Sequence, residues 1–271
     1  MTLSGARIRA LLLKELAELS RNRMALVPVV VLSLFSVGLP LLIAVAVPAL
    51  TGSLLSDDPE FLRLVQRGGI PIHLPALSNE GAVQAFVFQQ FLMLQLLIPA
   101  TGAMAFAGYS LIGEKQGRTL EPLLATPITT PELLIGKGLG ALLPSFGIMI
   151  MATLVYVACI AIFAHDGVLS AVINARSALL VFALGPLAAL VALQITVLVS
   201  SRVNDPRTAQ QFGALLILPL TGLFVMQFNG MVPLTTGVIL ALIAGLTVVW
   251  LGLVAAGVAL FERETILTRW K

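Results

Sequence analysis

The stretch GEKQGRTLEPLLATPITTPELLIGK, residues 113–137, is the most polar long segment of a chain that is otherwise nearly all apolar. Of the 271 residues, 58% are hydrophobic and only 11% are charged, and the mean hydropathy is +1.02. Soluble domains carry about 25% charged residues. The composition therefore indicates an integral membrane protein, in which segment 113–137 is a hydrophilic interruption between apolar runs.

Six apolar runs are long enough to cross the hydrocarbon core of a bilayer, which takes a helix of about 20 residues. They are Met24–Leu50, Ala85–Gly113, Gly138–Ala164, Ser177–Ser200, Ala209–Phe228 and Leu234–Phe261. Helices satisfy their own backbone hydrogen bonds in lipid, so we expect an all-α polytopic membrane protein with a six-helix transmembrane domain over residues 24–271. Pro219, Asn229, Gly230 and Pro233 interrupt the last two runs, which leaves open a short re-entrant hairpin between them.

The distribution of charge predicts the orientation. All 16 basic residues except Arg63, Arg67 and Arg176 precede the first run, follow the last run, or fall in loops that a six-span chain places on the same side. Loops rich in Lys and Arg stay in the cytoplasm. We therefore expect a multi-pass protein of the plasma (inner) membrane, with both termini and segment 113–137 in the cytoplasm. The net charge of +3 leaves no basic patch of the kind that binds nucleic acid.

Residues 1–23 are too charged to span and are predicted to form an amphipathic helix. Ile8, Leu12, Leu16 and Leu19 share one helical stripe, a pattern typical of a helix that lies in the headgroup plane. Two interpretations stay open for it: a simple anchor, or an elbow helix that packs beside the core and touches a cytoplasmic partner.

The loop of residues 51–84 is predicted to face outward and to contain one short helix. Asp58 is its expected N-cap, Pro59 its first residue and Gly68 its terminator. We interpret this loop as a structural lid on the outer face.

Segment 113–137 itself predicts a short amphipathic helix beneath the membrane. Leu120, Leu123 and Leu124 lie at positions i, i+3 and i+4, so that they share one face. That face requires cover, either from lipid headgroups or from a groove on a soluble partner.

A proline bounds this helix on its C-terminal side. Pro127 ends it, because the residue before a proline avoids the helical region. Thr129 or Thr130 is then expected to cap the next helix, with Pro131 in its first turn and Glu132 completing a capping box.

The segment resembles the signature region of ABC-2 type transporter permeases, notably their sodium-exporter-like NatB branch. In that family a cytoplasmic GEKE…TLEPLLATPI…ELLLGK pattern joins the second and third spans. The present chain carries GEK, TLEPLL, TPI, ELL and GK at the corresponding positions, whereas Gln116 stands where an acid is common. SSRVNDPRTAQQ (Ser200–Gln211) and LLLKELAELSRNR (Leu11–Arg23) resemble the family's link between the fourth and fifth spans and its N-terminal elbow.

The resemblance implies the permease subunit of an ABC exporter. Such a subunit pairs with a second permease chain, which is identical or different. It also binds a separate ATPase subunit. Because ATP and Mg bind to that ATPase, the chain itself is expected to bind no cofactor directly. Thr119–Ala125 would be the coupling helix within a cytoplasmic coupling segment, residues 114–137. The implied contact residues are Glu114, Thr119, Leu120, Glu121, Pro122, Leu123 and Leu124 at the ATPase, Lys14, Glu15 and Arg21 on the elbow helix, and Arg202, Asn204, Asp205 and Arg207 in the second cytoplasmic loop.

The chain is not expected to be an enzyme. Its only Gly-Lys pair, Gly136-Lys137, has Pro131 where a phosphate-binding loop needs its first glycine and Gly138 where it needs Ser or Thr. The two histidines and Cys159 lack metal-ligand spacing. We therefore predict no catalytic residue, no ATP site and no metal site.

Polar residues within the runs leave two functions to weigh. Gln90 and Gln194 either bond between helices or line a transport path. No run carries Asp, Glu, Lys or Arg deep in its middle, whereas proton- and ion-coupled transporters use such residues. We therefore favour an ABC permease over the alternative, a stand-alone secondary transporter or channel.

Overall fold

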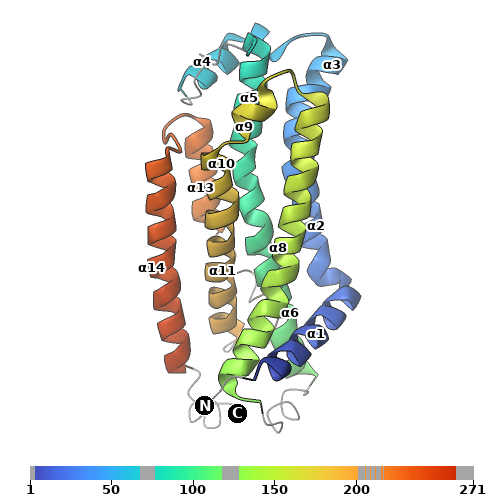
Figure 1. Ribbon diagram of the computed structural model, residues 1–271, viewed down its shortest axis with the longest axis vertical. Helices are drawn as coiled ribbons and strands as arrows, with labels where there is room; N and C mark the ends of the chain where they lie inside the picture. Colours follow the sequence, from blue (N-terminus) through green and yellow to red (C-terminus); the bar gives the residue numbers. More distant parts are fainter. Residues whose placement is uncertain are drawn as a thin grey trace.

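The computed structural model describes residues 4–67, 77–117, 128–200 and 217–260, together with the single positions 205, 208, 211 and 215. This part of the chain is an elongated bundle whose long helices run along one axis (Figure 1). A shorter helix, α1 (Gly5–Arg21), lies obliquely at one end, and α4 (Pro59–Arg67) lies at the other. We call these the α1 end and the α4 end.

Five helical segments of the described residues are long and apolar enough to cross a membrane. They correspond to the first four and the sixth of the predicted runs, so the all-α polytopic class is confirmed. The first two segments are Arg23–Thr51, which contains α2 (Arg23–Leu41) and α3 (Val47–Thr51), and Asn79–Glu114, which contains α5 (Asn79–Phe91) and most of α6 (Leu97–Gln116). The third is Glu132–Phe163, within α8 (Thr130–Phe163). The last two are Ala175–Ser200, with α10 (Ala175–Leu179) and α11 (Gly185–Ser200), and Thr236–Gly257, within α14 (Thr236–Leu260).

The predicted fifth run coincides in part with α13 (Ile217–Phe228), an apolar helix of 12 residues. At 1.5 Å per residue such a helix is about 18 Å long, which is shorter than the roughly 30 Å of hydrocarbon in a bilayer. Gly230 ends it in the left-handed conformation, with φ of 69°. Most of residues 201–216 lie outside the described part of the chain, so the count of six spans stays a prediction.

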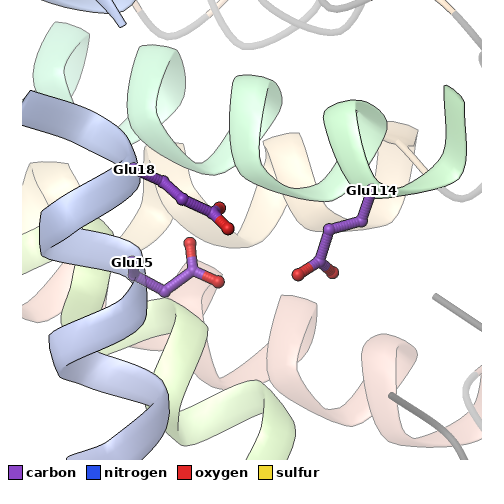
Figure 2. A group of neighbouring side chains, drawn as sticks. All are labelled: Glu15, Glu18 and Glu114. Carbon is purple, nitrogen blue, oxygen red and sulfur yellow. The ribbon is translucent and has the colours of Figure 1, made fainter. Parts of the chain in front are cut away.

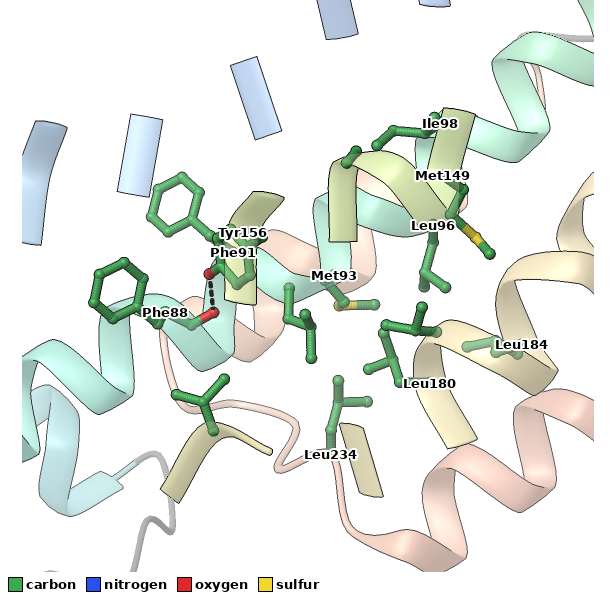
Figure 3. Close-up of a cluster of buried hydrophobic side chains, with 14 of the residues drawn as sticks. Phe88, Phe91, Met93, Leu96, Ile98, Met149, Tyr156, Leu180, Leu184 and Leu234 are labelled. Atoms are coloured by element: carbon green, nitrogen blue, oxygen red, sulfur yellow. Dashed lines mark hydrogen bonds between the residues drawn. The ribbon is translucent and has the colours of Figure 1, made fainter. Parts of the chain in front are cut away.

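The segment Asn79–Glu114 is the central helix of the bundle. Of its apolar window 89% is buried, against 6% for the segment Thr236–Gly257. It packs against α2, α8 and α11. In the core around its middle (Figure 3), the buried Tyr156 hydroxyl of α8 donates to the Phe88 carbonyl at 2.6 Å, and the two rings meet edge to face.

A proline explains one irregular turn of the first segment. Pro48 has no N–H, so it cannot donate to the carbonyl of Ala44 as a regular helix would require. The backbone widens into a π-helical turn over Leu42–Ala46. Gln84 of α5 supplies the missing donor, because its Nε2 lies 3.0 Å from the Ala44 carbonyl oxygen.

The loop at the α4 end has the predicted short helix. Asp58 Oδ1 accepts the N–H of Glu60 at 2.8 Å, and α4 begins at Pro59. The predicted N-cap and first residue are therefore confirmed. The predicted terminator, Gly68, lies outside the described residues.

Candidate functional site

Helix α1 packs against α8, next to the two ends of the polar segment (Figure 1). Its buried positions are Leu11 and Glu15. Ile8, Leu12 and Leu16 of the predicted apolar stripe are half-buried. The helix is therefore turned so that a charged side chain, as well as a leucine, faces the bundle.

Two glycines one turn apart on α8 allow this close approach. A Cβ added at Gly136 would lie 2.8 Å from the Leu11 Cβ, and one added at Gly140 would lie 2.6 Å from the Glu15 Cβ. Any larger residue would push α1 away at both places. Small residues of this spacing are typical of closely packed membrane helices, and they fix α1 to the beginning of α8.

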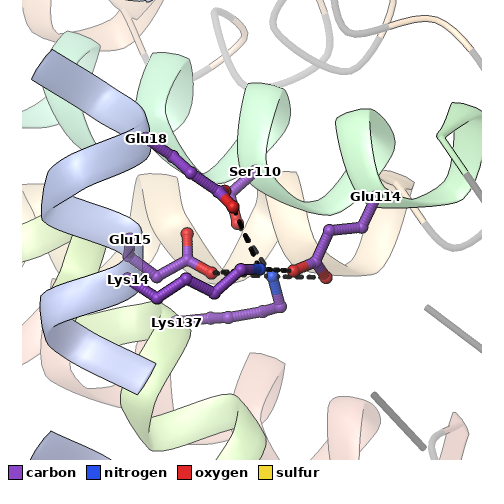
Figure 4. Close-up of polar contacts among 6 residues, drawn as sticks. All are labelled: Lys14, Glu15, Glu18, Ser110, Glu114 and Lys137. Atoms are coloured by element: carbon purple, nitrogen blue, oxygen red, sulfur yellow. Dashed lines mark hydrogen bonds and ion pairs between the residues drawn. The ribbon is translucent and has the colours of Figure 1, made fainter. Parts of the chain in front are cut away.

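Four charged side chains join α1 to both ends of the polar segment (Figure 4). Lys137 Nζ, near the beginning of α8, lies 3.0 Å from Glu15 Oε1 of α1 and 2.7 Å from Glu114 Oε2 near the end of α6. Lys14 of α1 also bonds Glu114. We call Lys14, Glu15, Glu114 and Lys137 the clamp, because they link α1, α6 and α8.

The clamp is largely shielded from solvent. The side chains of Glu15, Glu114 and Lys137 are each only 5% exposed, and Lys137 donates a further hydrogen bond to Ser110 Oγ at 2.9 Å. Burial alone would lower the pKa of Lys14, yet the hydrogen bond and charge of Glu114 outweigh burial and raise it. Removing one partner of a buried pair is strongly destabilising, so each clamp residue stabilises the placement of the others.

A second contact ties the beginning of α1 to α8. Thr129 caps α8, and Glu132 Oε2 accepts the Thr129 N–H at 2.9 Å in a capping box. Of the two threonines that the sequence left open, Thr129 is thus the cap. Glu132 Oε1 accepts the Ser4 N–H at 2.7 Å, and the Arg7 guanidinium lies 3.5 Å from Glu132 Oε2.

The two carboxylates of the clamp form a group with a third, that of Glu18. Glu15, Glu18 and Glu114 each place an oxygen within 4.8 Å of the others (Figure 2). Carboxylates so arranged can bind a cation. Here Lys14 lies 3.3 Å from Glu18 Oε1 and Lys137 bonds the other two carboxylates, so the chain's own ammonium groups supply the compensating charge.

The structure places some of the predicted contact residues and leaves others undescribed. Among the ATPase-coupling residues it describes Glu114. On the elbow helix, Lys14 and Glu15 belong to the clamp, whereas Arg21 is exposed in the last turn of α1. The predicted residues outside the described part are Thr119, Leu120, Glu121, Pro122, Leu123, Leu124, Arg202, Asn204 and Arg207.

One residue of the second predicted loop is described. Asp205 Oδ2 accepts hydrogen bonds from the N–H and the hydroxyl of Thr208, at 3.1 and 3.0 Å. This is a local turn contact, and its relation to a partner stays a prediction.

Both predicted path-lining glutamines contact neighbouring helices. Gln90 Nε2 lies 3.4 Å from the Gln227 carbonyl oxygen of α13. Gln194 Nε2 lies 3.4 Å from the Leu253 carbonyl oxygen of α14. Such interhelical bonds stabilise by about 0.6 kcal/mol on average, and these two are at the long end of hydrogen-bonding distance.

The sequence did not identify Glu132 and Lys137 as partners of the N-terminal helix, nor Ser110 as a hydrogen-bond partner of Lys137. A usable signal was present for two of them, because Glu132 and Lys137 are charged and lie next to an apolar run. Nothing in the pattern related them to residues more than a hundred positions earlier.

Length and apolar character of the described helices define a multi-pass, all-α membrane protein. In a comparison with models of protein families, residues 9–246 match the family described as ABC-2 family transporter protein. The chain belongs to this family, and the predicted resemblance to ABC-2 type permeases is confirmed. A search of curated proteins found no match to the chain.

Proposed function

We propose that the chain is the membrane-spanning subunit of an ABC exporter, driven by ATP that a separate ATPase subunit hydrolyses at the coupling segment. The family match supports a permease subunit. The observation that carries the proposed mechanism is the clamp, which joins the two helices flanking that segment to α1. On this proposal ATP and Mg bind to the ATPase, and the chain supplies the path and the mechanical connection.

The clamp lies where a force on the coupling segment would enter the bundle. Residues 117–129 connect α6 to α8, and Glu114 and Lys137 stand on the two helices that this connection joins. Because the two side chains lie 2.7 Å apart and both bond α1, α1 and the adjoining turns of α6 and α8 would move together. Displacement by a bound partner would then reach the membrane helices as a concerted motion.

The central position of α6 extends this connection into the core. The span that ends at Glu114 packs against α2, α8 and α11. Cores packed to crystal-like density transmit strain rather than absorb it. A shift of the last turn of α6 would therefore rearrange three neighbouring helices at once, which is what alternating exposure of a transport path requires.

The remaining elements of the proposal come from charge and from the family. The excess of basic residues on one side supports a cytoplasmic location for α1, the coupling segment and both termini. We place the protein in the plasma membrane, paired with a second permease chain. Export is the proposed direction.

Co-purification with a matched pair of variants tests the docking site. The chain is purified from its native membrane in mild detergent, and the accompanying proteins are identified. We expect a stoichiometric ATPase with the unchanged chain and with Leu54→Glu, which alters an exposed leucine near the α4 end. Leu123→Glu in the predicted coupling helix should release the ATPase without loss of membrane insertion. Equal ATPase recovery with both variants would overturn the proposed docking face.

A further inference from the structure

A cavity of about 280 Å³ lies among α6, α8, α11 and α14. Its walls are mainly apolar and include Leu193 and Val197 of α11 and Trp250 and Val254 of α14. The cavity is separate from the small space beside Glu15 and Glu18, because it lies on the side of α8 that faces α11 and α14.

Lys137 and Gln194, two polar side chains of the lining, already have partners. Lys137 bonds Glu15, Glu114 and Ser110 through its ammonium group. Gln194 donates to the Leu253 carbonyl. The cavity therefore offers an occupant chiefly apolar surface.

The size of the cavity limits the kind of molecule that could occupy it. An engineered apolar cavity of about 150 Å³ binds one benzene molecule, so a cavity of about 280 Å³ is large enough for a short stretch of hydrocarbon chain. The cavity therefore accommodates part of one flexible hydrocarbon chain.

The surroundings supply such a chain. α14 belongs to the least buried of the five spans, with 6% of its apolar window buried within the chain, and it rests on α11. Two glycines belong to the lining: a Cβ at Gly257 would lie 2.6 Å from Gln194 Nε2, whereas one at Gly138 would make an ordinary contact at 3.5 Å with Leu193 Cδ2. Trp250 adds an amphipathic ring of the type that anchors proteins near lipid headgroups.

We propose that this cavity binds one acyl chain of a bilayer phospholipid, which enters between α8 and α14. The lipid would fill the space between α14 and the rest of the bundle on the side of α8 opposite α1. Lys137 lines the cavity and belongs to the clamp, so the bound chain would pack directly against a residue that holds α1 in place.

Photo-crosslinking in nanodiscs tests this assignment. The purified complex is reconstituted with a phosphatidylethanolamine probe that carries a diazirine within one acyl chain, irradiated, and mapped by mass spectrometry. We expect adducts on Leu193, Val197 and Val254 in clear excess over adducts on Val248 and Leu251, which are lipid-exposed positions of α14.

Cavity-filling variants complete the test. Val254→Trp and Gly138→Leu should each reduce the cavity adducts by roughly an order of magnitude, as expected for an occupant that is displaced sterically. Gly252→Leu on the same helix, with no atom within 4 Å of its added Cβ, should leave them unchanged. If filling the cavity does not reduce these adducts, or if lining and lipid-exposed positions are labelled equally in the unchanged chain, the proposal is wrong. Detection of intact complex by gel filtration identifies any variant that fails to fold, and the other variant then decides.

Discussion

Lys137 of α8 and Glu15 of α1 lie 3.0 Å apart, Nζ to Oε1, although 122 positions separate them in the sequence. The same ammonium group lies 2.7 Å from Glu114, at the end of the second span. One lysine therefore determines how the N-terminal helix sits relative to both ends of the coupling segment. The following predictions address that arrangement and the helices it joins.

Lys137→Met is expected to destabilise the protein strongly. The change leaves Glu15 and Glu114 with fewer partners at positions that are only 5% exposed, and breaking a buried pair by removing one side costs about 3–5 kcal/mol. Thermal unfolding in detergent measures the effect. Adding Glu15→Gln to Lys137→Met should cost less than the sum of the two single changes, because the two residues interact. Strict additivity would contradict the clamp.

Gly140→Leu is expected to displace α1. The new side chain would begin 2.6 Å from the Glu15 Cβ, and overpacking of this kind costs about 1–3 kcal/mol. Leu11 is buried in the unchanged arrangement. In a chain that also carries Cys159→Ala, a Leu11→Cys side chain should therefore become reactive to a water-soluble maleimide once Gly140→Leu displaces α1. Gly147→Leu is the control on the same helix, because no atom lies within 4 Å of its added Cβ. Equal labelling in the two variants would show that α1 does not depend on this contact.

Stability should also fall at alkaline pH through Lys14. Its pKa is raised in the folded protein above the ordinary 10.5, so its contribution is present in full below that value and is lost as the pH rises through the folded pKa. The effect should be modest because the side chain is 37% exposed. Thermal unfolding from about pH 9 to about pH 12 should therefore show a steeper decline for the unchanged chain than for Lys14→Arg, whose guanidinium stays charged. Parallel curves would refute this role.

Gln84→Leu should destabilise the α4 half of the bundle. The amide donates to the Ala44 carbonyl at 3.0 Å and accepts the His165 N–H at 3.0 Å. Without the Gln84 amide, the Ala44 carbonyl has no donor, because Pro48 has no N–H. Leaving a buried carbonyl unsatisfied costs about 1–3 kcal/mol. Gln194→Leu, which removes a single contact at 3.4 Å, should shift the unfolding temperature less. A larger shift for Gln194→Leu would contradict this assignment.

The sequence predicted those parts of the fold that depend on local composition. Runs of apolar residues located five described spans, and residues 129–132 and 58–59 carried recognisable capping patterns. The fifth predicted run coincides with α13 over its 12 described residues, and the rest of that run stays a prediction.

The site depends on contacts between distant residues, and for that reason pattern reading found only part of it. The stripe of Ile8, Leu12 and Leu16 predicted a helix at the membrane surface, yet the buried positions of α1 are Leu11 and Glu15. A glutamate is buried there because Lys137 on another helix compensates its charge and Gly140 makes room for its stem. Neither cause is visible within the N-terminal segment itself.

The most direct test is transport in liposomes that contain the chain with or without its ATPase subunit, using sodium ion, a hydrophobic drug and a fluorescent phospholipid as probes. We predict that at least one probe moves only when the ATPase and MgATP are both present, and that Lys137→Met leaves ATP hydrolysis measurable while transport is lost. Transport by the chain alone, at a rate that neither the ATPase nor MgATP changes, would contradict an ATP-driven permease.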